Sequence, residues 1–99
     1  MRAFPELDVY QKEAASADRT GHLVAVMRAS DALHGISAQL GELSAMHAKR
    51  ARLGQLPSPS EVLPTLGKLL WYTAALATVH SLSLGNVADM NLRAIGVRK

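Results

Sequence analysis

The sequence predicts an all-α fold, a bundle of about four helices that forms one domain over residues 1–99. Apolar residues recur at intervals of three and four along most of the chain, which is the period of an amphipathic helix. Glycine, proline and serine stand at the points where this period stops. No stretch alternates apolar and polar residues as a half-buried strand does, and a chain of 99 residues is short for two domains.

The first predicted helix runs from Leu7 to about Arg19, before Thr20-Gly21 interrupts the pattern. Its apolar and small residues fall on one face and are Leu7, Tyr10, Ala14 and Ala17.

A long second helix is predicted from about Leu23 to Leu53, with Gly54 in the usual position after a helix end. Gly35 marks a point of bending. The apolar period passes through it without a break, so we expect one continuous helix, with a stripe at Leu33, Ile36, Leu40, Leu43 and His47.

Residues 54–60 form a loop by composition, and Ser58-Pro59-Ser60-Glu61 is typical of a capping box with proline at the first helical position. Pro64 allows a second start for the third helix, because proline lacks an amide proton and clashes with the carbonyl four residues back. We expect this helix to be the most buried one, with a wide stripe at Leu66, Leu69, Leu70, Thr73, Leu76, Ala77 and His80.

A short fourth helix is predicted after Ser83, a plausible N-cap, and Gly96 ends it. Its stripe comprises Leu84, Val87, Met90, Asn91 and Ile95.

Size and composition indicate that the chain does not complete its core alone. It is 48% hydrophobic but only 4% aromatic, and a chain this short buries a modest core. We therefore expect a homo-oligomer, either a dimer or a tetramer.

The absence of cysteine excludes disulfides, thiolate metal sites and a thiol nucleophile. The N-terminal residues lack the apolar core of a signal peptide, and we expect no apolar run to be long enough to span a membrane. A cytoplasmic protein without membrane contact is therefore expected. The four histidines, at positions 22, 34, 47 and 80, are not spaced as metal ligands, and no glycine-rich phosphate loop is present.

The net charge of +3 is scattered except at Lys49, Arg50 and Arg52. Cations at a helix C-terminus complement the helix dipole, and we favour this interpretation over a phosphate-binding patch. Nucleic acid is therefore not expected as a partner.

Four ordered stretches resemble the MazG-like all-α nucleotide pyrophosphohydrolases. Residues 10–20, YQKEAASADRT, are similar to a first helix in which "YQ" and "DRT" recur; residues 35–43, GISAQLGEL, resemble "GLAGEVGEL". Residues 66–72, LGKLLWY, resemble "LGDVLWY", and residues 82–92 resemble "LDLEEVAEANL". The resemblance implies a helical bundle that a second subunit completes.

The family's chemistry depends on an E-x-x-E motif on one helix and an E-x-x-D motif on the next. Four carboxylates on facing helices hold magnesium, which activates water as a nucleoside triphosphate is cut to monophosphate and pyrophosphate. The resemblance places these positions at Gln39, Glu42, Thr65 and Lys68, so only Glu42 keeps the acidic residue. Lys68 puts a cation where a metal ligand is needed, which disfavours magnesium.

Three functions are consistent with these residues. In the first, the chain is a catalytically degenerate family member without a cofactor, which binds a nucleotide, another phosphorylated ligand or a protein. Glu42 is then the one retained catalytic residue, and the ligand-binding candidates implied by the resemblance are Lys68, Asn91, Gln39, Trp71 and Tyr72. The lysine that usually follows the family asparagine corresponds to Ala94 here.

The other two functions differ in whether the chain itself reacts. An active magnesium-dependent enzyme would need Glu42 together with Glu13, Asp18 or Asp31. A structural or interaction module would instead pair with an intact paralogue and build one mixed site.

Overall fold

The computed structural model describes residues 4–18 and 20–97. These residues form four α-helices and no strand: α1 (Pro5–Ser16), α2 (Ala25–Ala51), α3 (Pro59–Val79) and α4 (Leu84–Ala94). The all-α prediction is confirmed, and the helix bounds lie close to the predicted ones. The first helix is shorter at its C-terminal end than predicted, and Arg19 lies outside the described residues.

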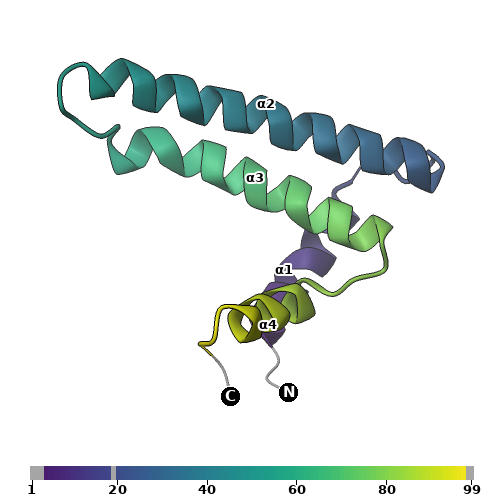
Figure 1. Ribbon diagram of the computed structural model, residues 1–99. Helices are drawn as coiled ribbons and strands as arrows, with labels where there is room; N and C mark the ends of the chain where they lie inside the picture. The colour runs from purple at the N-terminus through teal and green to yellow at the C-terminus, as the bar shows by residue number, and fades with distance from the viewer. Residues whose placement is uncertain (1–3, 19, 98–99) are drawn as a thin grey trace.

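Helices α2 and α3 form an antiparallel hairpin, and α1 and α4 lie together on one side of α3, away from α2 (Figure 1). Arg50 Nη2 donates to Glu61 Oε1 at 3.0 Å across the loop end of this hairpin. Gly54 ends the α2 segment with a φ of +65°, a conformation that glycine adopts without a steric cost.

The capping box at the start of α3 is confirmed. Ser58 Oγ accepts from the Glu61 amide at 3.3 Å, and Glu61 Oε1 accepts from the Ser58 amide at 3.0 Å. The alternative start at Pro64 is wrong, because α3 continues through this proline. The amide that proline lacks would have bonded Ser60, an exposed residue in the first turn, so water can satisfy that carbonyl.

Gly35 allows a close contact between α2 and α3. Helix α2 is continuous through this residue, as expected. A Cβ at position 35 would collide with the ring of Tyr72 on α3, so the absence of a side chain lets the ring rest against the α2 backbone.

Helix α1 anchors α4 by capping its N-terminus. The Leu84 amide donates to Gln11 Oε1 at 2.7 Å and the Gly85 amide donates to Asp8 Oδ1 at 2.8 Å. Ser83 Oγ accepts from the next amide, at Asn86, at 3.0 Å. Three of the N–H groups that lack a partner within α4 are therefore satisfied by side chains, and the Asp8 carboxylate also complements the helix dipole.

The core of the single chain is small. The apolar residues buried in it are three alanines and one leucine, and three polar residues are buried beside them: Ala32, Ala74, Ala77 and Leu84, with Gln39, Thr65 and Asp89. The stripe predicted for α3 is only partly buried: Ala77 is buried and Leu69 and Leu76 are half-buried, whereas Leu66 and Leu70 are 50% and 40% exposed. Among the described residues, α3 packs mainly on α1 and α2, so one side of it stays open.

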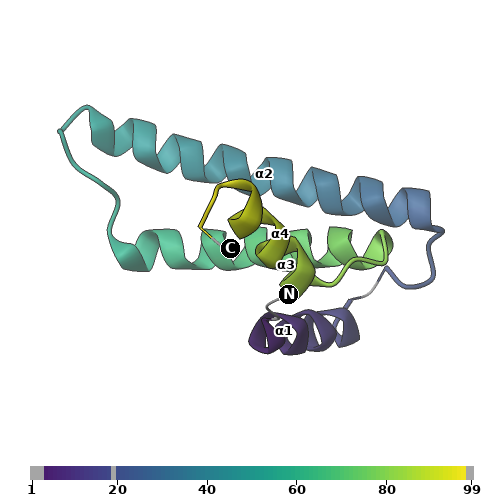
Figure 2. The ribbon, with the colours of Figure 1, turned by 60° about the horizontal axis from the view of Figure 1, so that its bottom comes forward.

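The chain is flat rather than spherical (Figure 2), with extents of 43 × 40 × 20 Å and a radius of gyration of 15.6 Å. A compact chain of this length would have a radius of about 13 Å. Helix α3 is also long and apolar enough, by length and composition, to cross a membrane, which corrects the expectation that no apolar run reaches that length.

Candidate functional site

The four positions that the resemblance assigns to acidic motifs lie on the two facing helices of the hairpin. Gln39 and Thr65 are buried between them, at 8% and 4% exposure, whereas Glu42 and Lys68 are exposed. Gln39 Oε1 is buried without a hydrogen-bond partner among the described residues. The amide of Gln39 and the hydroxyl of Thr65 are therefore buried, whereas the charged groups of Glu42 and Lys68 reach solvent.

Glu42 and Lys68 do not form an ion pair in the described part of the chain, although their charges are opposite. The residue types at these four positions supply one carboxylate, which is fewer than a magnesium site of this kind uses. Within residues 4–18 and 20–97, no group of three histidine, cysteine, aspartate or glutamate side chains is placed to hold a metal ion.

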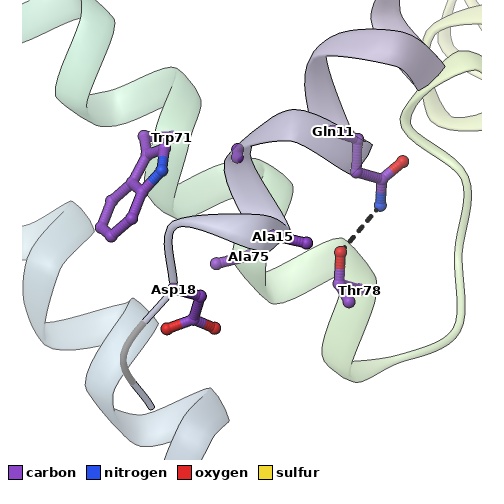
Figure 3. A pocket seen from close by; sticks show the side chains of 7 residues that line it. Gln11, Ala15, Asp18, Trp71, Ala75 and Thr78 are labelled. Carbon is purple, nitrogen blue, oxygen red and sulfur yellow. Dashed lines mark hydrogen bonds between the residues drawn. The ribbon is translucent and has the colours of Figure 1, made fainter. Parts of the chain in front are cut away.

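Trp71 and Tyr72 are both half-buried but contact different helices. Their rings meet edge to face, with centroids 5.2 Å apart and planes 69° from parallel. Tyr72 lies against Gly35 on α2, and Trp71 lines a hollow between α1 and α3 (Figure 3). The pair thus packs the hairpin against α1, which is a structural role.

The hollow beside Trp71 has a volume of about 10 Å³, room for about one water molecule. Its other lining residues are Gln11, Ala14, Ala15, Asp18, Ala75 and Thr78 (Figure 3). Gln11 Nε2 donates to Thr78 Oγ1 at 3.0 Å and to the Leu82 carbonyl at 2.9 Å, so its amide already has partners. A nucleotide does not fit a space of this size.

Asp18 is held by its own loop. Its Oδ1 accepts from the Thr20 hydroxyl at 2.6 Å and from the Thr20 amide at 2.8 Å, and Arg28 Nη2 lies 3.9 Å from Oδ2. The hydrogen bond from the Thr20 hydroxyl is the main reason that the pKa of Asp18 is lowered, and Arg28 contributes less. This carboxylate connects α1 to α2.

Asn91 is exposed on α4, a helix that packs mainly on α1. The structure therefore brings Gln39, Glu42, Thr65 and Lys68 to one hairpin and places Asn91 on a separate layer. Among the basic residues near the end of α2, Arg50 pairs with Glu61.

The hairpin carries an apolar surface of exposed residues, four of which belong to the stripes predicted from the sequence. We call it the open face and define it by six exposed residues, Val26, Leu33 and Leu40 on α2 and Leu63, Leu66 and Leu70 on α3. The α2 part of the open face can be found in the sequence, because residues 26, 33 and 40 follow one another at intervals of seven and therefore share one side of the helix.

The fold defines an all-α protein whose two long helices carry exposed apolar side chains. Comparison of the chain with protein-family models, with characterised proteins and with solved structures found no match.

Proposed function

We propose that this chain is a noncatalytic protein of the MazG-like type, whose role is to associate with another helical protein through its open face. The observation that carries the proposal is the exposure of six large apolar side chains on one hairpin, from 40% at Leu70 to 80% at Val26. Apolar surface of this extent is rare on proteins that act alone and is typical of an interaction site.

The residues at the motif positions support the noncatalytic part of the proposal. Lys68 and Thr65 replace two carboxylates on α3, and Gln39 replaces one on α2. An ammonium group raises the cost of holding a divalent cation nearby, and a single carboxylate at Glu42 does not offset it. Nucleoside triphosphate hydrolysis is thus not the role we assign.

A phosphate-release assay with added pyrophosphatase, magnesium and a panel of nucleoside triphosphates tests this assignment. We expect no turnover above the rate without protein. Turnover that disappears in Glu42→Ala would overturn the noncatalytic assignment, and Glu6→Ala provides a matched control on an exposed glutamate of α1.

The resemblance itself has a separate test. The triple variant Gln39→Glu, Thr65→Glu and Lys68→Asp restores the four carboxylates of the acidic motifs. If the chain has the MazG-like arrangement, calorimetry should show a gain of magnesium affinity in this variant, since oxygen ligands from two facing helices then converge. An unchanged affinity in a folded variant would contradict the resemblance.

A second candidate function is binding of a nucleotide or another phosphorylated ligand without metal. It is favoured by the buried Gln39 Oε1, which lacks a partner in the described residues, and by the exposed Lys68 on the facing helix, a point charge suited to phosphate. Calorimetry without magnesium tests it. Binding lost in Lys68→Ala but kept in Lys12→Ala, an exposed lysine on α1, would support this candidate.

A further inference from the structure

We infer that the loop end of the α2–α3 hairpin contacts the surface of an anionic phospholipid bilayer. Two leucines enter the boundary between headgroups and acyl chains, and two cations contact the lipid headgroups. We call this end the hairpin tip and define it by Lys49, Arg52, Leu53 and Leu56. None of these residues belongs to the open face, so this surface goes beyond the proposed function and does not depend on it.

The two leucines of the hairpin tip are strongly exposed. Leu53 is 67% exposed and Leu56 is 81% exposed, the highest value for a large apolar side chain among the described residues. Pro57 is buried, so the chain returns to the protein directly after Leu56. Burial of such side chains in an apolar phase is favourable, and the fold itself does not bury them.

The hairpin tip projects beyond the other two helices. Helices α1 and α4 lie toward the other end of the hairpin, and the loop end extends past both of them (Figure 1 and Figure 2). The contacts of α1 with α3 include Trp71, Ala75 and Thr78, which all lie in the C-terminal half of α3. The tip can therefore reach a flat surface without a collision of α1 or α4.

The backbone of the tip is closed without help from the two leucines. The Gln55 amide donates to the Arg50 carbonyl at 3.1 Å, and the φ of Gly54 is +65°. The Gly54 amide donates to the Ala51 carbonyl at 3.0 Å, which completes a Schellman motif. The apolar contact that often accompanies this motif would join the positions of Arg50 and Gln55, and both are polar here. The end of α2 thus assigns no structural contact to either leucine.

The tip also carries net positive charge. Residues 49–61 contain three cations, Lys49, Arg50 and Arg52, and one carboxylate, Glu61, which leaves a net charge of +2. Arg50 pairs with Glu61 at 3.0 Å, whereas Lys49 and Arg52 are exposed and form no ion pair with another described residue. These two cations complement the dipole of α2 and stay accessible to an anionic ligand.

The combination of leucines and cations selects the kind of surface. Nucleic acid would contact Lys49 and Arg52 through phosphate but leave both leucines in water. A zwitterionic bilayer would take up the leucines and gain little from the cations. An anionic bilayer satisfies both groups, because each lysine or arginine near its surface adds attraction. Neither a signal peptide nor a spanning segment is needed, since the tip enters only the headgroup boundary.

Sedimentation of the full chain with vesicles tests the inference. We expect binding to vesicles of equal parts phosphatidylcholine and phosphatidylserine, and at least about tenfold weaker binding to phosphatidylcholine alone. Added salt should weaken the binding, because it screens exposed charges. Leu56→Ser should weaken it by about tenfold and Lys49→Gln by about fivefold.

Two matched controls lie outside the tip. Leu66→Ser removes an exposed leucine of the same hairpin, and Lys12→Gln removes an exposed cation of α1. Each should leave the vesicle binding within about twofold of wild type, because neither side chain belongs to the surface that contacts lipid.

A labelled cysteine keeps the test decisive if Leu56→Ser alters the loop. The chain has no cysteine of its own. A polarity-sensitive dye on Leu56→Cys should shift its emission to the blue when the mixed vesicles are added, because the dye leaves water. The same dye on Ala45→Cys, an exposed position on α2 away from the tip, should not shift. Equal shifts at the two positions would overturn the inference.

The remaining outcomes are also decisive. The inference is overturned if the chain does not bind the mixed vesicles or binds both kinds equally. It is also overturned if Leu66→Ser weakens binding more than Leu56→Ser, because α3 then makes the membrane contact. Binding of double-stranded DNA without vesicle binding, lost in Lys49→Gln but kept in Leu56→Ser, assigns the tip to nucleic acid instead. Each of these results leaves the proposed function as it is, and turnover of a nucleoside triphosphate contradicts only the proposed function.

Discussion

The ring of Tyr72 on α3 occupies the space that a Cβ at Gly35 on α2 would fill. This contact sets how closely the two long helices approach each other, and it sits midway along the hairpin on which the candidate site and the open face are both built.

Gly35→Ala should destabilise the protein by up to about 2 kcal/mol in urea denaturation, although alanine favours helices over glycine by about 1 kcal/mol. The reason is that the ring must move out of a packed contact, which costs about 1–3 kcal/mol. Gly41→Ala in the same helix has open space around it and should stabilise the protein. Equal changes in the free energy of unfolding for the two variants would show that the Tyr72 contact does not contribute to stability.

Gln11→Glu should loosen α4 from α1. The carboxylate keeps an acceptor for the Leu84 amide but loses the donor that reaches the Leu82 carbonyl and Thr78 Oγ1. We expect a loss of about 1 kcal/mol in thermal unfolding and faster amide hydrogen exchange in α4, because two hydrogen bonds between α1 and the α3–α4 segment lose their donor. Lys12→Gln changes the neighbouring exposed residue and should stay within about 0.5 kcal/mol of wild type.

Stability should fall at acid pH partly through Asp18. The pKa of this carboxyl is lowered in the folded chain, chiefly by the hydrogen bond from the Thr20 hydroxyl, so the folded state binds the proton less readily than the unfolded state. The stabilisation is therefore complete above the unfolded pKa of about 4 and is lost as the pH falls through the lower folded pKa.

Melting temperatures measured between neutral pH and pH 2 for wild type and Asp18→Asn provide the check. The gap between the two proteins should be widest above pH ~4 and narrow below it. A gap that stays constant over this range would mean that the charge of Asp18 does not contribute.

Ser58→Ala should destabilise α3 by about 1 kcal/mol, because Ser58 Oγ accepts from the Glu61 amide at the helix N-terminus. Ser60→Ala is the control, since the Ser60 hydroxyl meets only the Ser58 hydroxyl in the described residues and should cost less than about 0.5 kcal/mol. Chemical denaturation of both variants distinguishes a capping role from a general loss of hydroxyl groups.

Local residues by themselves determined the four helices and most of their ends. The caps at Ser58 and Ser83 and the glycines at 54 and 96 act within a few positions along the chain, so a sequence pattern is sufficient to predict them. The four positions of the candidate site could be named in the same way, because a resemblance aligns residues one by one.

Only the tertiary structure decided which sides of these helices are covered. The apolar spacing of α3 predicts that Leu66 and Leu70 belong to the core, yet both are exposed because α1 packs on the other side of the helix. Gln39 is buried while Glu42, one turn away, is exposed, and this depends on the rotation of α2 about its axis. The helical period shows which residues share one side of a helix. Which side is buried depends on contacts between residues far apart in the sequence, such as Gln11 with Leu84 or Gly35 with Tyr72.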